Sequence, residues 1–119
     1  HEDSRTTLLN IAQDTTTPDN ARTAALDMLA RGWPNQDSWD CAANCVQGAE
    51  VSLRETAIRL LALVWPQTSK TAALLVSAAE SDMSAEVRAT AAQAVAYIEA
   101  IAEINPASVP AGELHPRPM

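Results

Sequence analysis

The feature that most constrains the fold of this chain is an internal repeat. Residues 53–66 read LRETAIRLLALVWP, a near copy (ARTAALDMLARGWP) occupies residues 21–34, and a looser copy (VRATAAQAVAYIEA) follows at residues 87–100. The copies agree at four positions: Arg22, Arg54 and Arg88; Ala25, Ala57 and Ala91; Leu29, Leu61 and Val95; Ala30, Ala62 and Ala96. A unit that recurs at a fixed spacing of a few tens of residues is the signature of a stacked repeat protein.

The composition of the chain predicts that these units are helical. Hydrophobic residues make up 47% of the 119 residues, Phe is absent and there are only 3 glycines. Ala and Leu dominate the apolar fraction, and both are strong helix formers, whereas strands favour β-branched and aromatic residues. No strand pattern competes, so we expect an all-α domain.

Apolar periodicity and turn signals predict about six helices. We expect a lone helix, two complete pairs and a terminal helix, over residues 7–14, 18–31, 37–47, 50–64, 70–80 and 85–104. Polar side chains that can accept a backbone N–H are the expected N-terminal caps, namely Thr17, Asp37, Ser52 (with Glu55 at capping-box spacing), Thr68 or Ser69, and Ser84. In the second helix the predicted buried face is Ala21, Ala24, Ala25, Met28 and Leu29.

The two ends of the chain are expected to lie outside the packed helices. Residues 1–6 are polar and should be frayed. Residues 105–119 contain four of the seven prolines and should form an extended or disordered tail. The predicted helical-repeat domain is therefore residues 7–104.

The charge of the chain argues against several classes of partner. The net charge is −7, and the 8 Lys and Arg residues are scattered, whereas a nucleic-acid backbone calls for clustered positive charge. No apolar run approaches the ~20 residues of a membrane span, and no signal peptide is visible. We therefore expect a cytoplasmic protein that binds neither nucleic acid nor a membrane.

Two cysteines, Cys41 and Cys45, lie one helical turn apart. Such a pair cannot staple distant segments, so we expect a reducing compartment and two small buried side chains. A metal site would need two further ligands, and neither His1 nor His115 lies near them in sequence. We expect no metal and no cofactor.

The repeated unit resembles a HEAT repeat. Its cleanest instance is the acidic turn and Val-Arg pair of residues 81–88 (SDMSAEVR), followed by Ala91, Val95 and Ala96. The resemblance covers residues 7–104. It implies a short right-handed α-solenoid of antiparallel helix pairs, with the Arg-bearing first helices on the outer face and the second helices lining the inner one.

Two of the Arg-bearing helices end in Trp-Pro, as RGWP at residues 31–34 and LVWP at residues 63–66. This variant is similar to the C-terminal helical repeats of bacterial NACHT-type (STAND) signalling ATPases. That similarity implies a sensor or autoinhibitory arm beside a nucleotide-binding motor, often in defence against phage. No GxxxxGK[ST] loop occurs in this chain, so the motor would lie elsewhere in a longer protein. The third copy lacks Trp-Pro, which fits a terminal unit.

The repeated Arg and Trp residues are expected to be structural. Arg22, Arg54 and Arg88 would stack in a row, which is either a basic ladder for a ligand or a set of pairs with nearby acids such as Asp19, Glu50 and Glu86. The HEAT resemblance supports the second interpretation, because in that family this Arg links successive units through an Asp. Trp33 and Trp65 are expected to fill the gaps between adjacent units.

The second helices are less repetitive, so they are the expected location of a partner-binding surface. The candidate residues are Trp39, Asp40, Asn44, Gln47, Lys70 and Ser77. We expect the partner to be another protein or other domains of the same longer chain. The only histidines, His1 and His115, lie in the two ends of the chain, so the sequence does not indicate a Ser/His/Asp triad and we do not expect an enzyme. The alternatives are a stand-alone HEAT-repeat scaffold or adaptor, and a HEAT-fold enzyme acting on DNA bases, which the charge disfavours.

Overall fold

The computed structural model describes the backbone of residues 2–104 and the side chains of residues 4–104. This part of the chain forms six α-helices and no strand. The helices are α1 (Glu2–Gln13), α2 (Asp19–Gly32), α3 (Gln36–Val46), α4 (Val51–Val64), α5 (Ser69–Ser81) and α6 (Ala85–Ile104). The all-α prediction and the number of helices are confirmed. The predicted tail, residues 105–119, lies outside the described residues.

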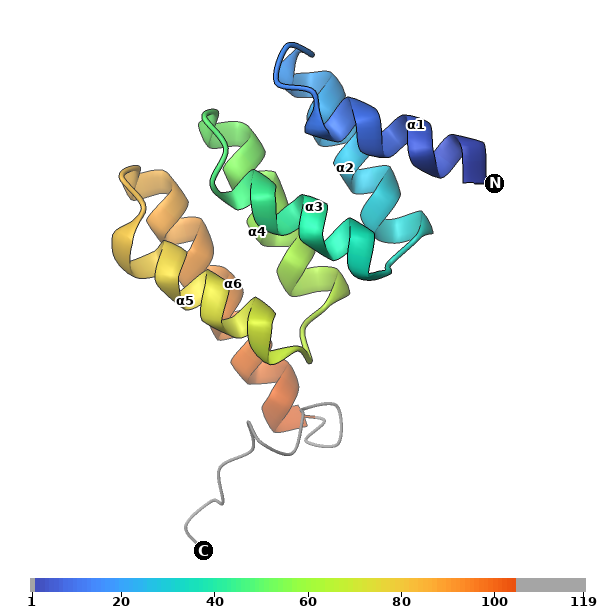
Figure 1. Ribbon diagram of the computed structural model, residues 1–119. Helices are drawn as coiled ribbons and strands as arrows, with labels where there is room; N and C mark the ends of the chain where they lie inside the picture. Colours follow the sequence, from blue (N-terminus) through green and yellow to red (C-terminus); the bar gives the residue numbers. More distant parts are fainter. Residues whose placement is uncertain (1, 105–119) are drawn as a thin grey trace, which may run out of the picture.

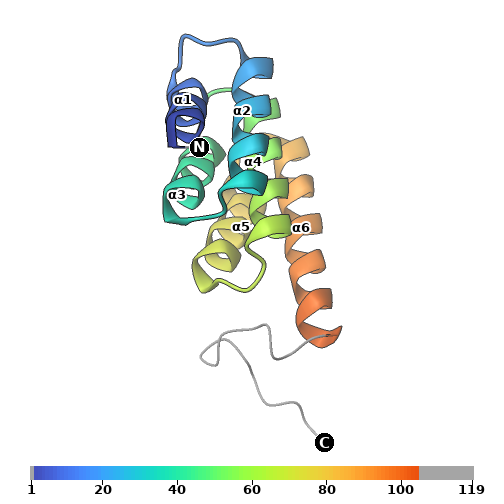
Figure 2. The same ribbon diagram turned by 90° about the vertical axis from the view of Figure 1, so that its right-hand side faces the viewer.

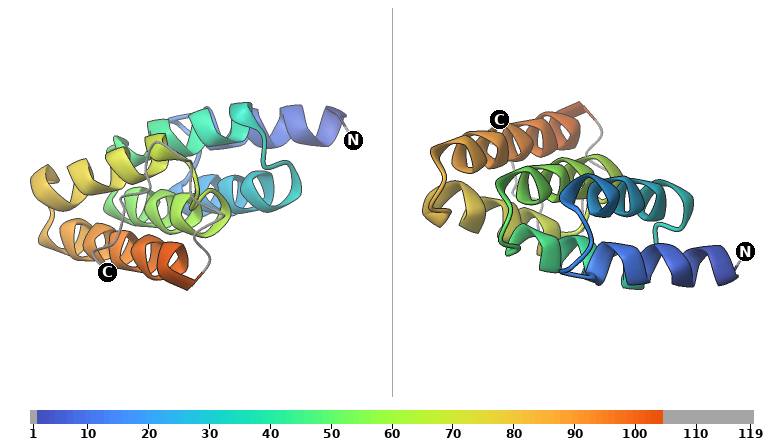
Figure 3. Two further views of the ribbon diagram at one scale, coloured as in Figure 1. Left: turned by 90° about the horizontal axis from the view of Figure 1, so that it is seen from below. Right: turned by 90° about the horizontal axis from the view of Figure 1, so that it is seen from above.

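The helices lie in two layers, with α1, α3 and α5 in one and α2, α4 and α6 in the other (Figures 1 and 2). Among helices that follow one another in sequence, the most extensive packing joins α1 to α2, α3 to α4 and α5 to α6. The chain therefore forms three helical hairpins, α1–α2, α3–α4 and α5–α6, in place of the expected lone helix, two pairs and terminal helix. Figure 3 shows α1 and α6 on opposite sides of the molecule.

The turns between hairpins start at the two Trp-Pro pairs. The backbone N–H of Trp33 donates to Leu29 O at 2.9 Å, and that of Trp65 donates to Leu61 O at 3.0 Å. The following proline has no N–H and cannot continue the helical hydrogen bonding. Each Arg-bearing helix of the first two hairpins therefore ends at its Trp, and the chain turns into the next hairpin.

Side chains accept hydrogen bonds from free N–H groups at the starts of α3, α5 and α6. The predictions of Thr17 and Ser52 as caps are wrong, because α2 and α4 follow Pro18 and Glu50 without a side-chain cap. Thr68 accepts from Thr71 N at 3.4 Å at the start of α5, and Ser84 accepts from Val87 N at 3.3 Å at the start of α6. The cap of α3 is Asn35, which accepts from Ser38 N at 3.1 Å. The prediction of Asp37 as this cap is wrong, because α3 starts at Gln36 and Asp37 lies inside its first turn.

The first helix begins earlier than the sequence pattern suggests. α1 starts at Glu2, so most of the segment expected to be frayed is helical. Arg5 in this segment donates from Nη1 to Asp37 Oδ2 at 3.1 Å. This contact joins the start of α1 to α3.

The core runs through both layers along the row of hairpins. Its largest fully buried side chains are Leu26, Leu29, Leu53, Ile58, Leu61, Leu75 and Val87. The repeated apolar positions are buried in α2 and α4, as predicted; in α6 Ala91 is buried, Val95 is half-buried and Ala96 is exposed. The prediction that the neighbouring Ala24 and Met28 are buried is wrong, since both are exposed.

Candidate functional site

Trp39 and Lys70, two of the predicted partner-binding residues, lie together near the starts of α3 and α5. The Trp39 indole Nε1–H donates to Thr71 Oγ1 at 2.8 Å. The Lys70 ammonium lies 6.0 Å from the centroid of the Trp39 ring, at the limit of a cation–π contact. Trp39 is half-buried and Lys70 is exposed. The ring is therefore fixed by its neighbours while part of it remains open to solvent.

A hollow of about 250 Å³ opens beside this pair, between two successive hairpins. We call it the Trp39 hollow; it is lined by Pro34, Asn35, Gln36, Trp39, Trp65, Thr68 and Lys70. Two indole rings and a proline offer apolar surface, and the lysine offers a positive charge at the rim. Such a hollow can receive an apolar side chain that has a carboxylate nearby.

The other predicted partner-binding residues are not part of this hollow. Gln47 and Ser77 line a second hollow of about 350 Å³ at the opposite ends of α3 and α5. Asn44 lines a third one of about 600 Å³, together with Arg22 and both cysteines. Asp40 is exposed and accepts a hydrogen bond from Gln36 Nε2 at 2.8 Å. The six candidates therefore do not form one site.

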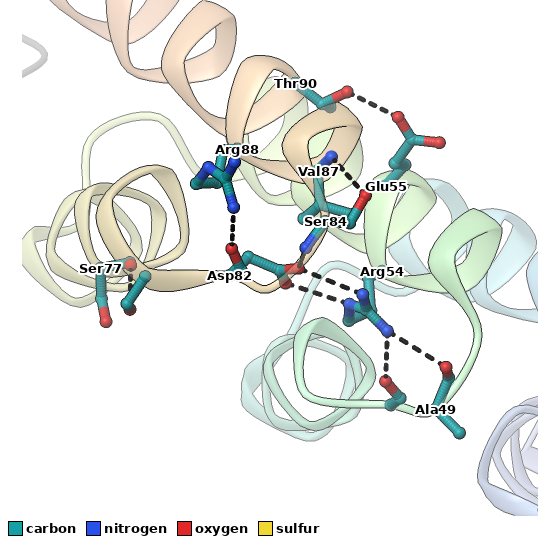
Figure 4. Close-up of polar contacts among 11 residues, drawn as sticks. Ala49, Arg54, Glu55, Ser77, Asp82, Ser84, Val87, Arg88 and Thr90 are labelled. Atoms are coloured by element: carbon teal, nitrogen blue, oxygen red, sulfur yellow. Dashed lines mark hydrogen bonds and ion pairs between the residues drawn. The ribbon is translucent and has the colours of Figure 1, made fainter.

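Arg54 makes the most extensive polar contact between hairpins (Figure 4). Its Nε and Nη2 donate to the two carboxylate oxygens of Asp82 at 3.0 and 3.1 Å. Its Nη1 donates to the carbonyls of Gly48 and Ala49 at 3.0 and 3.1 Å. The side chains of Arg54 and Asp82 are only 13% and 10% exposed. One guanidinium thus ties the turn before its own helix to the turn of the next hairpin.

Arg22 and Arg88 occupy the same place in their own hairpins. Arg22 Nε donates to Ala12 O at 3.0 Å, and Arg88 Nη1 donates to Asp82 O at 2.6 Å. Arg54 and Arg88 therefore bind a carbonyl of the turn before their helix, whereas Arg22 binds a carbonyl in the last turn of α1. Arg54 uses all three guanidinium nitrogens inside the fold, which favours the structural interpretation for this arginine.

The acids that sequence spacing suggested as partners of these arginines have other roles. The side chain of Asp19 lies on the side of α2 that faces α4, where its Oδ2 accepts from the Ser52 hydroxyl. Its Oδ1 is buried and has no hydrogen-bond partner among the described residues. Glu50 and Glu86 are exposed. The ion pair of Arg54 is formed with Asp82, across the gap between hairpins.

The environment of Asp82 lowers the pKa of its carboxyl group. Burial alone would raise this pKa, but the N–H of Ser84 and the guanidinium of Arg54, with Arg88 nearby, outweigh it. The Ser84 N–H donates to Asp82 Oδ1 at 2.9 Å. Asp82 is therefore charged at neutral pH, as its ion pair requires.

Asp14 makes the same local turn without a pairing arginine. Its Oδ1 accepts from both the hydroxyl and the N–H of Thr16, and its Oδ2 accepts from the hydroxyl of Thr17. The Thr16 hydroxyl is the main cause of the lowered pKa of Asp14. Asp14 is exposed, so its contacts shape the turn between α1 and α2 but do not join hairpins.

Cys41 and Cys45 are free, buried thiols on one face of α3, as predicted. A hydrogen bond with Cys45, together with burial, raises the pKa of Cys41. A thiol with a raised pKa is a poor nucleophile, because the thiolate is the reactive form. Within the described part of the chain, no three His, Cys, Asp or Glu side chains are grouped as a metal site.

The polar groups that sequence reasoning missed are those that act across hairpins. Thr71 is fully buried as the acceptor for Trp39, and Ser38 is buried with its hydroxyl donating to Trp33 O. Asp82 could have been found, because the acidic turn before Val87-Arg88 is the part of the repeat that most resembles HEAT. Nothing in the sequence distinguishes Thr71 as a buried acceptor, because threonine is an ordinary residue in the first turn of a helix.

Comparisons with protein-family models, with curated proteins and with solved structures found no match for this chain. No helix of residues 2–104 has both the length and the apolar character needed to cross a membrane.

Proposed function

We propose that this chain is a protein-interaction module built as a HEAT-like α-solenoid, and that it serves as the sensor arm of a longer NACHT-like ATPase. The observation that carries the proposal is the Trp39 hollow. It combines partly open aromatic rings with an exposed lysine at a junction between repeated hairpins. Aromatic side chains of this kind are enriched where proteins bind one another.

The repeat itself supports the solenoid part of the proposal. Three hairpins follow one another, and the equivalent residues Arg54 and Arg88 each donate from Nη1 to a carbonyl six residues earlier, in the turn before their helix. Repeats that contact mainly their neighbours form extended arrays, and such arrays present long surfaces to partners. The right-handed sense and the inner position of α3 and α5 belong to this proposal.

The NACHT-like context is supported by the two Trp-Pro turns. In such a context the module changes the activity of a motor in the same protein, and it needs no cofactor. The second candidate is a stand-alone scaffold or adaptor, which the same hollow would serve equally well. Neither candidate is an enzyme, and with a net charge of −7 neither binds nucleic acid.

The gene that encodes this chain, together with the purified full-length product, tests the proposal. We expect a GxxxxGK[ST] loop in frame upstream of residue 1. We also expect that deleting residues 1–119 changes basal ATP hydrolysis by at least ~5-fold, the low end of typical coupling between sites. A start codon directly before His1 would favour the scaffold. An ATPase whose rate is indifferent to the deletion would overturn the sensor role.

The Trp39 hollow is tested in the same full-length protein. Trp39→Ala combined with Lys70→Glu should reproduce most of the effect of the deletion, because it removes the ring and reverses the charge at the rim. Glu80→Ala is the matched control, since Glu80 is exposed on α5, the helix that carries Lys70, but lies outside the hollow. Equal effects of the two changes would show that the hollow is not the binding surface.

A further inference from the structure

The edge of α2 that faces away from α4 exposes an apolar side chain that the repeat buries elsewhere. In the aligned copies, Met28 occupies the position of Leu60 in α4 and of Ala94 in α6. Leu60 is 3% exposed and Ala94 is 7% exposed, whereas Met28 is 56% exposed. The position in the helix is the same, so the difference comes from the neighbouring element.

The missing neighbour can be identified from the other two hairpins. Thr90, four residues before Ala94 on the same side of α6, donates from Oγ1 to Glu55 Oε2 at 2.8 Å (Figure 4). This side of α6 therefore faces α4, and by the same register the Leu60 side of α4 faces α2. Among the described residues no helix lies beyond α2 in this row (Figure 2). Ala24 and Met28 are thus exposed where Thr90 and Ala94 are covered.

The two ends of the row are not alike. On the side toward the following hairpin, α2 carries Leu26 and α4 carries Ile58, and both are fully buried. α6 carries Ala92 at this position, and Ala92 and the nearby Ala96 are exposed. An alanine leaves little apolar surface in water, whereas Met28 leaves more. At this position the free edge of α6 therefore exposes less apolar surface than the free edge of α2 does at Met28.

We infer that the Ala24–Met28 edge of α2 is the docking surface for one further helical hairpin of the same repeat type, which precedes α1 in the same polypeptide. That hairpin would place the residue equivalent to Ile58 against Met28, as α4 places Ile58 toward α6. A second copy of this chain is a poorer occupant, because the free edge of its α6 offers Ala92 in place of a large side chain. The inference rests on the proposed function, in which the chain is part of a longer repeat protein.

A designed extension tests this docking. A second copy of residues 33–68, which contain α3, α4 and the turn that leads to α5, is joined before residue 2. Met28→Cys is introduced into the extended and the original chain, and its labelling by a maleimide is followed by mass spectrometry. We expect labelling to slow by at least ~10-fold in the extended chain, since a covered thiol reacts only when the helices open. Equal labelling rates in the two chains would overturn the inference.

Met83→Cys is the control for labelling, because Met83 is 96% exposed and lies near the other end of the row. Its labelling rate should be the same in both chains. Met28→Asp supplies a second readout that needs no thiol. It should change the melting temperature of the original chain little, because the site is exposed, and it should remove the stabilisation gained by the extension. A loss of similar size in both chains would contradict the docking.

Sedimentation of the original chain distinguishes the source of the occupant. If the original chain is a monomer, the result supports a hairpin of the same polypeptide as the occupant. If it is a dimer that Met28→Asp dissociates, the occupant is a second copy of the chain and the inference is overturned. The labelling result is independent of any ATPase. Slowed labelling without an upstream P-loop would support the docking and overturn the proposed sensor role. Unchanged labelling with an upstream P-loop would overturn the docking and leave the proposed sensor role standing.

Discussion

Arg54 and Asp82 form a two-point ion pair between α4 and the turn that joins α5 to α6, with N–O distances of 3.0 and 3.1 Å. Parallel N–H···O bonds of this kind are among the stronger polar contacts in proteins, because their geometry and charge both match. The pair is mostly shielded from solvent. It is the principal polar link between the second and third hairpins.

Removing the carboxylate of this pair should destabilise the fold. We expect Asp82→Ala to lower the free energy of unfolding by about 3 kcal/mol, because it leaves the Arg54 charge largely buried without a counter-charge. The loss should not be larger, since the carbonyls of Gly48 and Ala49 still receive the guanidinium. Urea denaturation measures it. The control is Asp27→Ala, which breaks the exposed Arg31–Asp27 pair and should cost less than ~1 kcal/mol. Equal losses would show that burial of the Arg54 pair is unimportant.

The contribution of Asp82 should depend on pH. Its pKa in the folded protein lies below the ordinary value of 3.8, so the folded state binds this proton more weakly than the unfolded state. The stability that Asp82 supplies is therefore present above pH 3.8 and is lost as the pH falls through the folded pKa. In urea titrations between pH 7 and pH 2, the difference in the free energy of unfolding between the wild type and Asp82→Asn should become smaller below pH 3.8. A difference that grows on acidification would contradict this sign.

The acceptor of the Trp39 indole should contribute measurably to stability. Thr71→Val removes the hydroxyl at a fully buried position while keeping its shape, so the Trp39 indole N–H and the Thr68 hydroxyl both lose their acceptor. We expect a loss of about 1 kcal/mol, because Trp39 is only half-buried and water can partly replace the hydroxyl. Thermal unfolding followed by tryptophan fluorescence measures it. Thr71→Ser keeps the acceptor, so its stability should be closer to that of the wild type. If Thr71→Ser is less stable than Thr71→Val, the role of the hydroxyl is refuted.

A charge in the core and a charge at the surface of α4 should have opposite outcomes. Leu61 is fully buried, whereas Leu63, two residues later, is 49% exposed. Leu61→Asp should abolish cooperative unfolding, because it places a carboxylate among apolar side chains. Leu63→Asp should unfold cooperatively with a midpoint near that of the wild type. Circular dichroism melts compare the two, and a wild-type midpoint for Leu61→Asp would refute its place in the core.

The helices and most of the core could be predicted from the sequence, because apolar periodicity reports the side of a helix that is covered. The same periodicity failed at Met28 and Ala24. The copies share their pattern, but α2 is the first helix of its row and lacks the neighbour that covers the equivalent side of α4. Periodicity shows which side of a helix is apolar, and only the structure shows which neighbours are present.

The partners of polar side chains could be predicted only where they lie in the same turn. Thr68 and Ser84 cap the helices they precede, and local sequence is sufficient for that. Arg54 and Trp39 instead find their partners in the next hairpin, at Asp82 and Thr71, and the placement of hairpins decides such contacts. For the same reason the six predicted partner-binding residues are divided among separate hollows, although they share two neighbouring helices.

A double-mutant cycle between Arg54 and Asp82 tests most directly the claim that Arg54 links the second hairpin to the third. Free energies of unfolding are measured for the wild type, Arg54→Ala, Asp82→Ala and the double variant. We predict a coupling free energy of about 2 kcal/mol, within the range for residues that share a buried polar contact. If the two single losses add to within ~0.3 kcal/mol, the residues do not interact in solution and the linked-hairpin account is contradicted.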